Sequence, residues 1–280
     1  MKYANLHLHS VYSDSQLTPY QLVLIGKSLG YRALALTDHW TDAGIPEFSE
    51  MARRESIETI SGVEFDAKDL GVSFHITALD FDTENSKIKK MIKDQVEART
   101  ECSRKCFERG VSLGYVEGIT WDDVIDFVDE GSWVCFDHIV GAMRYKRVIP
   151  QVGNTSDLRQ KLFKAPEVAA FSPKKPSTAE IIKTIREAGG IATLAHPYKQ
   201  IKYLPQLIEL GINGIEVSHP ELIEEYTRLA CEAADTYKLY RSGGTDHTGA
   251  MSGCDGVYAT SALQGITEEE FMIIKERRLG

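Results

Sequence analysis

The residues of this chain with the clearest chemical potential are its histidines, most of which lie beside another type of ligand or next to a short apolar run. His7 and His9 form a His-x-His pair, and His39 directly follows Asp38. The other histidines placed in this way are His75, His196 and His247. Neutral imidazole is a common transition-metal ligand, and carboxylates complete such sites. This repeated placement predicts one metal site at one rim of a sheet or barrel.

The spacing of the first pair suits a shared metal ion. Side chains alternate along a strand, so His7 and His9 point to the same face and can converge on one ion at the end of the strand. Asp14 is within loop reach, either as a further ligand or as an ordinary turn residue or helix cap. Glu64 follows a β-like run, where it is either a solvated acid or a carboxylate that bridges two metals.

Short strands and amphipathic helices alternate in the first part of the chain and again after residue 172. The expected strands are 3–8, 33–37, 57–65, 73–80, 191–195, 214–217 and 240–244, and the expected helices are 18–30, 44–54, 179–188, 201–210 and 221–238. Strands separated by helices predict parallel βα units. At least six apolar runs that each end in a polar group favour an α/β barrel with its site at the C-terminal rim.

The middle of the chain has a different character. Residues 87–109 are strongly helical and highly charged, and Thr120 begins a capping motif before a second short helix. We therefore expect one domain made of residues 1–90 and 172–280. Residues 91–171 are expected to form a helical insertion subdomain over the active site.

The bulk composition limits the function classes. A chain of 280 residues can bury roughly 75% of its unfolded surface. The net charge of −9 disfavours broad binding to nucleic acid or to an anionic membrane, although bound divalent cations would reverse the charge inside a cleft and admit an anionic substrate. The five cysteines are odd in number and lack CxxC spacing, which predicts reduced thiols in the cytoplasm. No secretory leader or membrane-spanning run is expected.

Five motifs, taken together and in order, resemble the PHP (polymerase and histidinol phosphatase) domain over essentially the whole chain. They are His7-Leu8-His9-Ser10 with Asp14, Thr37-Asp38-His39, Gly62-Val63-Glu64, Leu194-Ala195-His196-Pro197 and Gly244-Thr245-Asp246. The helical middle, followed by Pro176-Ser177-Thr178-Ala179-Glu180, is most similar to the branch that hydrolyses phosphate from nucleotide 5′ ends. Members of that branch act on nucleoside 3′,5′-bisphosphates or short 5′-phosphorylated oligonucleotides. The resemblance implies a distorted (β/α)7 barrel and two or three divalent ions, often manganese, iron or zinc.

The resemblance also implies a set of ligands for each ion. One metal would be held by His7, His9, Glu64 and Asp246. A second would be held by Asp14 and His39, with His247 as a further ligand, and a third by Glu64, His75 and His196, with Glu64 bridging.

Two departures from the family pattern concern the C-terminal motif and the insertion. The family usually has Asp-x-His, whereas here His247 directly follows Asp246 and Thr248 takes the usual place. His247 then reaches the second metal through a shifted turn, or that metal has one ligand fewer. The insertion of this branch usually carries an arginine-proline-histidine stretch that helps bind phosphate, whereas this chain has Cys135-Phe136-Asp137-His138, without the arginine.

The expected substrate-binding residues follow from these departures. His138 would contact the substrate phosphate, and Arg144 or Lys146 would replace the missing arginine, unless both belong to a solvated basic surface. His219, which follows another apolar strand, would either contact the substrate or hydrogen-bond a metal ligand from behind.

Together these features predict a phosphoric monoester hydrolase in which a metal-bridging hydroxide attacks phosphorus in line. The expected catalytic residues are Glu64, His196, Asp246 and His247, the last three as alternatives for proton transfer to the leaving oxygen. The expected partner is a small phosphorylated substrate, with a nucleotide favoured over a long duplex or a membrane. The alternatives are a histidinol-phosphate or sugar-phosphate phosphatase, an amidohydrolase-type enzyme of amide or lactone bonds, and a non-catalytic metal-binding module.

Overall fold

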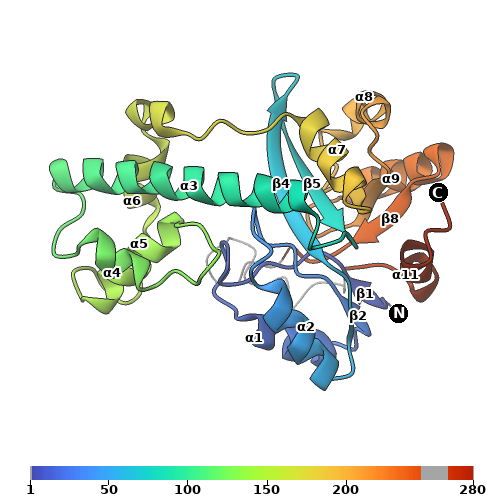
Figure 1. The fold of residues 1–280 in the computed structure, drawn as a ribbon, viewed down its shortest axis with the longest axis horizontal. Helices are drawn as coiled ribbons and strands as arrows, with labels where there is room; N and C mark the ends of the chain where they lie inside the picture. The colour runs from blue at the N-terminus through green and yellow to red at the C-terminus, as the bar shows by residue number, and fades with distance from the viewer. Residues whose placement is uncertain (1, 247–263, 280) are drawn as a thin grey trace. The chain divides into compact units, whose positions relative to one another are not determined.

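The computed structural model describes residues 2–246 and 264–279, and the chain divides into two compact units (Figure 1). The sheet unit comprises Met1–Met91 and Lys175–Gly280, and the helical unit comprises Ile92–Lys174. Both α-helices and β-sheets are present, so the fold is mixed α/β. Within the described residues, no helix is long and apolar enough to cross a membrane.

The sheet unit contains two sheets. The first is parallel and has the order β1 (Ala4–Asn5), β2 (Ala33–Leu34) and β3 (Glu58–Thr59). The second has the order β4 (Gly62–Asp69), β5 (Val72–Leu79), β6 (Ile191–Leu194), β7 (Gly214–Ser218) and β8 (Tyr240–Gly243). The helices of this unit are α1 (Pro19–Ser28), α2 (Ile45–Arg54), α7 (Thr178–Glu187), α8 (Leu204–Glu209), α9 (Glu224–Tyr237) and α11 (Glu268–Lys275).

The expectation of parallel βα units does not extend to β5, which no helix separates from β4. This strand is antiparallel to both of its neighbours, β4 and β6, whereas β6, β7 and β8 are parallel. Only Leu70 and Gly71 separate β4 from β5, and both have positive φ, of 53° and 75°. A two-residue turn of this kind closes a hairpin and leaves no room for the crossover that a parallel pair needs.

Backbone hydrogen bonds join the two sheets at both of their borders. On one side Leu6 N donates to Gly243 O at 2.9 Å, and Asp246 N donates to His7 O at 2.9 Å. On the other side Trp40 N donates to Glu64 O at 3.0 Å, and a parallel bridge pairs Glu64 with His39. The extensions of β1 and β2 therefore lie beside β8 and β4 respectively.

Among the described residues of the sheet unit, apolar side chains gather in two clusters. One lies between the strands and α11, with Leu6, Leu79, Ile191, Phe271 and Ile274 buried. The other packs α1 and α2 on the first sheet, and its buried members are Leu8, Leu22, Val23, Tyr31, Leu34, Leu36, Phe48, Ala52 and Ile57. These two clusters hold the strands in place. The polar residues that follow the strands are therefore attached to a rigid, packed part of the unit.

The helical unit has its own core. Its elements are the greater part of α3 (Ser86–Ser112), then α4 (Trp121–Ile125), α5 (Phe136–Tyr145), α6 (Ser156–Arg159), the π-helical turn η1 (Gln160–Lys164) and the 3-10 turn η2 (Pro166–Phe171). Phe107, Val116, Val124, Ile139 and Leu162 are buried in one cluster. This segment is therefore able to bury its apolar side chains against one another.

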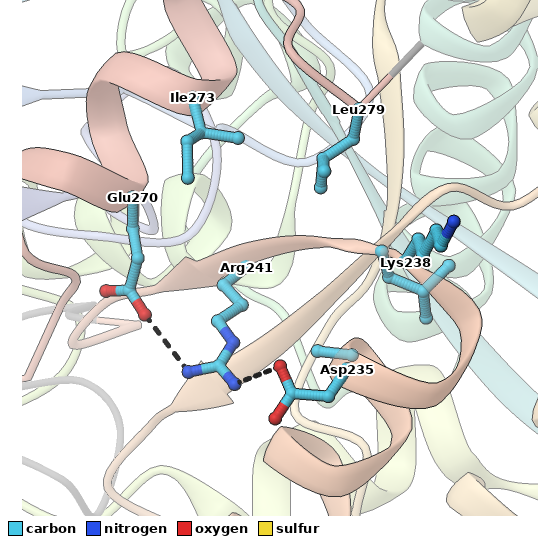
Figure 2. A pocket seen from close by; sticks show the side chains of 8 residues that line it. Asp235, Lys238, Arg241, Glu270, Ile273 and Leu279 are labelled. Carbon is cyan, nitrogen blue, oxygen red and sulfur yellow. Dashed lines mark hydrogen bonds and ion pairs between the residues drawn. The ribbon is translucent and has the colours of Figure 1, made fainter.

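A pocket lies at the start of β8, beside α9 and α11 (Figure 2). Arg241 crosses it and contacts Asp235 at 2.7 Å and Glu270 at 3.4 Å, so its guanidinium is already paired with two carboxylates. Asp246 follows the opposite, C-terminal end of the same strand. We read this pocket as a structural clamp between two helices and the sheet, separate from the residues discussed next.

Gly244 allows the end of β8 to pack directly against the His-x-His segment. A Cβ atom at this position would overlap the backbone nitrogen and Cβ of His7. We expect Gly244→Ala to lower the free energy of unfolding by about 1–3 kcal/mol, the usual cost of overpacking, and to displace His7. Thermal unfolding and metal content measure both effects. Gly141→Ala in α5 is the matched control, because its Cβ would meet only ordinary contacts.

Candidate metal centre

The sheet unit brings together the predicted ligands that the structure describes. The ligands lie on, or just after, six different strands. His7 and His9 follow β1, His39 follows β2, Glu64 lies on β4, His75 lies on β5, His196 follows β6 and Asp246 follows β8. The polar groups that follow separate apolar runs in the sequence thus converge on one site, with Asp14 in the loop after His9.

Four of these side chains enclose a space of the size of a metal ion. His7 Nε2 lies 3.5 Å from Glu64 Oε2 and 3.6 Å from Asp246 Oδ1. His9 Nε2 lies 3.4 Å from the same Glu64 oxygen and 3.0 Å from the same Asp246 oxygen. Ligand atoms about 2.0–2.2 Å from a common ion are roughly 2.8–3.6 Å apart in octahedral or tetrahedral geometry. These separations therefore fit four ligands of one ion.

The imidazole nitrogens of this group also fit a metal. Among the described residues, His7 Nε2 and both ring nitrogens of His9 are buried atoms without a hydrogen-bond partner. His7 and His9 are at most 1% exposed. Buried polar atoms almost always have a partner, so an unsatisfied cluster points to a group that the protein alone does not supply. A divalent cation would satisfy these nitrogens together.

A second group lies around Asp14. Its two carboxylate oxygens lie 3.6 Å from His9 Nδ1 and 3.7 Å from His39 Nε2. His39 directs its other nitrogen, Nδ1, to Glu64 Oε2 at 3.2 Å. Asp14 and His39 therefore face one another as the resemblance implies.

The third predicted group lies on the other side of Glu64. His75 Nδ1 lies 2.9 Å from Glu64 Oε1, and His196 Nε2 lies 3.3 Å from the same oxygen. The other oxygen, Oε2, faces His7 and His9. A buried carboxylate whose two oxygens face two different sets of histidines has the geometry of a bridging ligand.

The charges of the site are strongly coupled. Burial lowers the pKa of His7, but Glu216, Asp246 and Glu64 outweigh it and leave that pKa well above its ordinary value. The pKa of His9 is raised to about 9, because Asp246 and Asp14 outweigh its burial.

The carboxylates of the site shift in the opposite direction. Burial raises the pKa of Glu64, but the surrounding histidines, led by His39 and His75, bring it well below the ordinary value. Burial also raises the pKa of Asp246, and His7, His219 and His9 outweigh it. Without a metal the centre therefore favours protons on His7 and His9 and ionised carboxylates, whereas burial lowers the pKa of His39.

Two of the predicted catalytic residues have unusual backbone conformations. His196 has φ of 29° and Asp246 has φ of 48°, both in the left-handed region that non-glycine residues rarely adopt. Such conformations cost about 1–3 kcal/mol each and persist where the surrounding structure imposes them, often at functional sites. Both residues come directly after a strand, where the chain must turn to present their side chains.

Two buried carboxylates that sequence analysis did not assign support the site from behind. Asp38 accepts hydrogen bonds from Ser10 N, Ser10 Oγ and Ser13 Oγ at 2.5–2.7 Å, which holds the loop that carries Asp14. Glu216 lies 3.2 Å from His7 Nδ1. A signal was present for Glu216, because it is an acid in the middle of the apolar run Gly214-Ile215-Glu216-Val217.

His219 contacts a predicted ligand. Glu221 N donates a hydrogen bond to His219 Nδ1 at 3.1 Å, so in the neutral ring the proton is on Nε2. That nitrogen lies 3.2 Å from Asp246 Oδ2 and donates to it. Of the two roles expected from the sequence, this contact fits a histidine that hydrogen-bonds a metal ligand.

The predicted substrate-binding residues of the helical unit make local contacts. His138 Nδ1 accepts a hydrogen bond from Cys135 N at 3.0 Å and so caps the start of α5. Arg144 donates to Gly153 O at 3.1 Å, and Lys146 contacts Asp123 at 2.6 Å. The remaining predicted residue, His247, lies outside the described residues.

Comparisons with known proteins agree with this geometry. The family model of the PHP domain matches residues 5–254. A phosphoribosyl 1,2-cyclic phosphate 1,2-diphosphodiesterase of Eggerthella lenta is 28% identical over 88% of this chain and 94% of its own length. A 5′-3′ exoribonuclease of Haemophilus influenzae is 30% identical, with 86% and 88% covered. A 3′,5′-nucleoside bisphosphate phosphatase of Chromobacterium violaceum is 28% identical, with 86% of each chain covered.

Solved structures are similar as well. A protein of Bifidobacterium adolescentis named as a metal-dependent phosphoesterase superimposes with a TM-score of 0.78 at 28% identity, and the match covers 99% of this chain and 96% of that one.

Proposed function

This chain belongs to the PHP domain family and is a metal-dependent phosphoesterase, and from that premise we propose that it removes phosphate from the 5′ end of small nucleotides or oligonucleotides. The observation that carries the proposal is the cluster of His7, His9, Glu64 and Asp246. The distances between its nitrogen and oxygen atoms are those expected between four ligand atoms of one metal ion. The relatives from Haemophilus influenzae and Chromobacterium violaceum support nucleotides as the substrate class.

We also propose that the strands form a distorted (β/α)7 barrel. The backbone bonds from Leu6 to Gly243 and between Trp40 and Glu64 support it, because they join the two sheets at both borders. If β3 and β4 count as one interrupted strand, the barrel has seven. Residues 91–171 would form a helical insertion subdomain, a proposal supported by the separate core of that segment.

Two or three divalent ions, manganese, iron or zinc, would be held by the three groups of residues. The first would be held by His7, His9, Glu64 and Asp246, the second by Asp14, His39 and His247, and the third by Glu64, His75 and His196. When bound, such ions make water a nucleophile near neutral pH and stabilise charge on phosphate oxygens.

The protein's own residues would orient the ligands and move protons. Glu64 would divide its two oxygens between neighbouring ligand groups. His219 would donate its Nε2 proton to Asp246 Oδ2 and keep Asp246 Oδ1 directed to His9. His196, Asp246 and His247 remain the proposed residues for proton transfer to the leaving oxygen, since each lies next to the ligand cluster or next to Asp246 in the sequence.

The helical unit would recognise the substrate. The proposed contacts for the substrate phosphate are His138 together with Arg144 or Lys146. Lys146 would exchange its ion pair with Asp123 for that phosphate, at little cost because exposed ion pairs contribute little to stability. We also infer that the protein acts in the cytoplasm, where its cysteines stay reduced.

A substrate panel tests the proposal. Metal-stripped protein would be loaded with manganese, iron or zinc and assayed for phosphate release from four monoesters: adenosine 5′-monophosphate, adenosine 3′,5′-bisphosphate, a 5′-phosphorylated dinucleotide and histidinol phosphate. We expect the bisphosphate or the dinucleotide to be preferred. Cleavage of histidinol phosphate alone would overturn the nucleotide assignment, and release from none of them would favour an amidohydrolase-type or non-catalytic role.

The Eggerthella lenta relative supplies a further substrate for the panel. A five-membered cyclic phosphodiester requires only one hydrolytic step to become a monoester, and the same cluster would suit that step. Phosphoribosyl 1,2-cyclic phosphate is therefore assayed beside the monoesters. Its cleavage at a higher kcat/KM than any nucleotide would replace our substrate assignment and keep the metal-dependent chemistry.

A further inference from the structure

Glu216 is a buried acid in the centre of β7, and only 1% of its surface is exposed. Its carboxylate oxygens lie 3.2 and 3.4 Å from His7 Nδ1. One of them, Oε2, also accepts a hydrogen bond from the backbone N–H of His196 at 2.7 Å. One carboxylate thus contacts residues from two of the three proposed ligand groups.

The contact with His7 determines which nitrogen can bind a metal. A carboxylate beside Nδ1 keeps a proton on that nitrogen, so in the neutral ring the lone pair is on Nε2. Nε2 is the atom that faces Glu64 and Asp246 and has no hydrogen-bond partner among the described residues. Glu216 therefore orients the ring of His7 with its ligand atom directed into the first group.

The contact with His196 acts on the backbone. His196 has a φ of 29°, a conformation that needs support from its surroundings. Its N–H donates to Glu216, while its side chain reaches Glu64 Oε1 at 3.3 Å. The charged hydrogen bond from behind therefore stabilises the turn that presents His196 to the third group.

We propose that Glu216 is a positioning residue that sets His7 and His196 at the same time, and so couples the first metal site to the third. The inference rests on the proposed metal-dependent function, because it assumes that both histidines are ligands. Glu216 is not expected to contact the substrate or a metal, since both of its oxygens are engaged by protein N–H groups.

A glutamine at this position would have nearly the same shape and half of the acceptors. His7 Nδ1–H and His196 N–H both need an acceptor, whereas an amide has one oxygen and one NH2 group. If the oxygen faces His196, the NH2 group faces His7 Nδ1 and favours the proton on Nε2, the wrong nitrogen for ligation. If the amide is reversed, His196 N–H loses its acceptor.

Metal titration separates this role from a general structural one. Metal-free protein would be titrated with Mn2+ alone, and free Mn2+ would be measured by electron paramagnetic resonance. We expect Glu216→Gln to lower the Mn2+ affinity of the two sites that contain His7 and His196 by about 10–100-fold. This is the usual effect of removing a hydrogen-bond partner of a metal ligand. The ion held by Asp14 and His39 should retain its affinity.

Asp38→Asn is the matched control, because Asp38 is an equally buried carboxylate that holds the loop of Asp14. Asp38→Asn should lower the Mn2+ affinity of the site formed by Asp14 and His39 and leave the affinity of the other sites unchanged. The inference is overturned if Glu216→Gln binds Mn2+ at every site with wild-type affinity, or if the variant loses affinity equally at all sites. If wild-type protein binds no Mn2+ at all, the proposed function itself fails.

Folding is checked by thermal unfolding of the metal-free variants. If Glu216→Gln does not fold, Glu216→Asp takes its place, because it keeps the charge but is one methylene shorter and cannot reach both partners. We then expect selective weakening of the same ions, and wild-type affinity in Glu216→Asp would overturn the inference.

Discussion

Glu64→Gln is expected to reduce kcat/KM for the preferred phosphate ester by about a thousandfold or more, which corresponds to roughly 4 kcal/mol of transition-state stabilisation. The variant removes a charge that lies within 3.5 Å of His7 and within 2.9 Å of His75. It also replaces one of two oxygens that face different ligand groups by an NH2 group, which cannot ligate a metal. Its oxygen Oε2 faces His7 and His9, and Oε1 faces His75 and His196, so the substitution disturbs the imidazoles of two groups at once.

The measurement combines kinetics with metal analysis. Elemental analysis of the dialysed variant should show fewer bound ions than wild-type protein. Glu50→Gln is the matched control, because Glu50 is an exposed acid paired with Arg53 and Arg54 and should lose almost no activity. A Glu64→Gln variant that kept more than a tenth of wild-type kcat/KM would falsify the bridging role.

The sequence predicted much of the secondary structure, because its signals were local. Thr18 begins α1 with the reciprocal cap to Gln21, and Thr120 caps α4 through Asp123. The strand before His196 and the strand 214–217 lie within one residue of β6 and β7. Caps, glycines and apolar runs each act within a few residues, so a single sequence is enough to find them.

Features that depend on contacts distant in the sequence were missed. The strands 57–65 and 73–80 were expected without a direction, because alternation alone does not show that β4 and β5 form an antiparallel hairpin. The expected strand 57–65 is divided into β3 and β4, which belong to different sheets.

The predicted ligand set depended on the resemblance more than on periodicity. Composition and spacing indicated a metal site, and the family motifs then grouped the residues. The role of Glu216 became visible only when β7 was placed beside His7, whereas for His219 the contact with Asp246 selects one of the two roles expected from the sequence. A hydrogen-bond partner 209 positions away leaves no pattern in a single sequence.

Removal of the metal is expected to give a protein whose stability falls as pH rises from about 6.5 to about 9. The folded-state pKa of His9 is about 9 and lies above its ordinary value of 6.5. A raised pKa stabilises the folded state fully below the unfolded pKa, and this contribution is lost as pH rises through the folded one. The pKa of His7 is raised as well and acts in the same direction.

The affinity for metal should change with pH in the opposite direction to the stability of the metal-free protein. Imidazoles bind metals in the neutral form, so each ion must displace the protons that the metal-free site retains on His7 and His9. Affinity should therefore rise with pH by roughly tenfold per unit for each proton released, until the pH passes the pKa of the residue concerned. The stabilisation by metal, read as the difference in Tm between loaded and stripped protein, should widen over the same range.

Calorimetry can count those protons directly. Titration of stripped protein with Zn2+ at pH 7, in two buffers with different ionisation enthalpies, gives the number of protons released per ion. We expect at least one proton from the first site, and one fewer in His9→Gln, which cannot be protonated at that position. The lowered pKa values of Glu64 and Asp246 mean that neither carboxylate contributes a proton at this pH. Binding without proton release would mean that His7 and His9 are already neutral in the stripped protein. In that case Glu64 and Asp246 would not hold protons on these imidazoles in the metal-free site, and the expected pH dependence of metal affinity would be wrong.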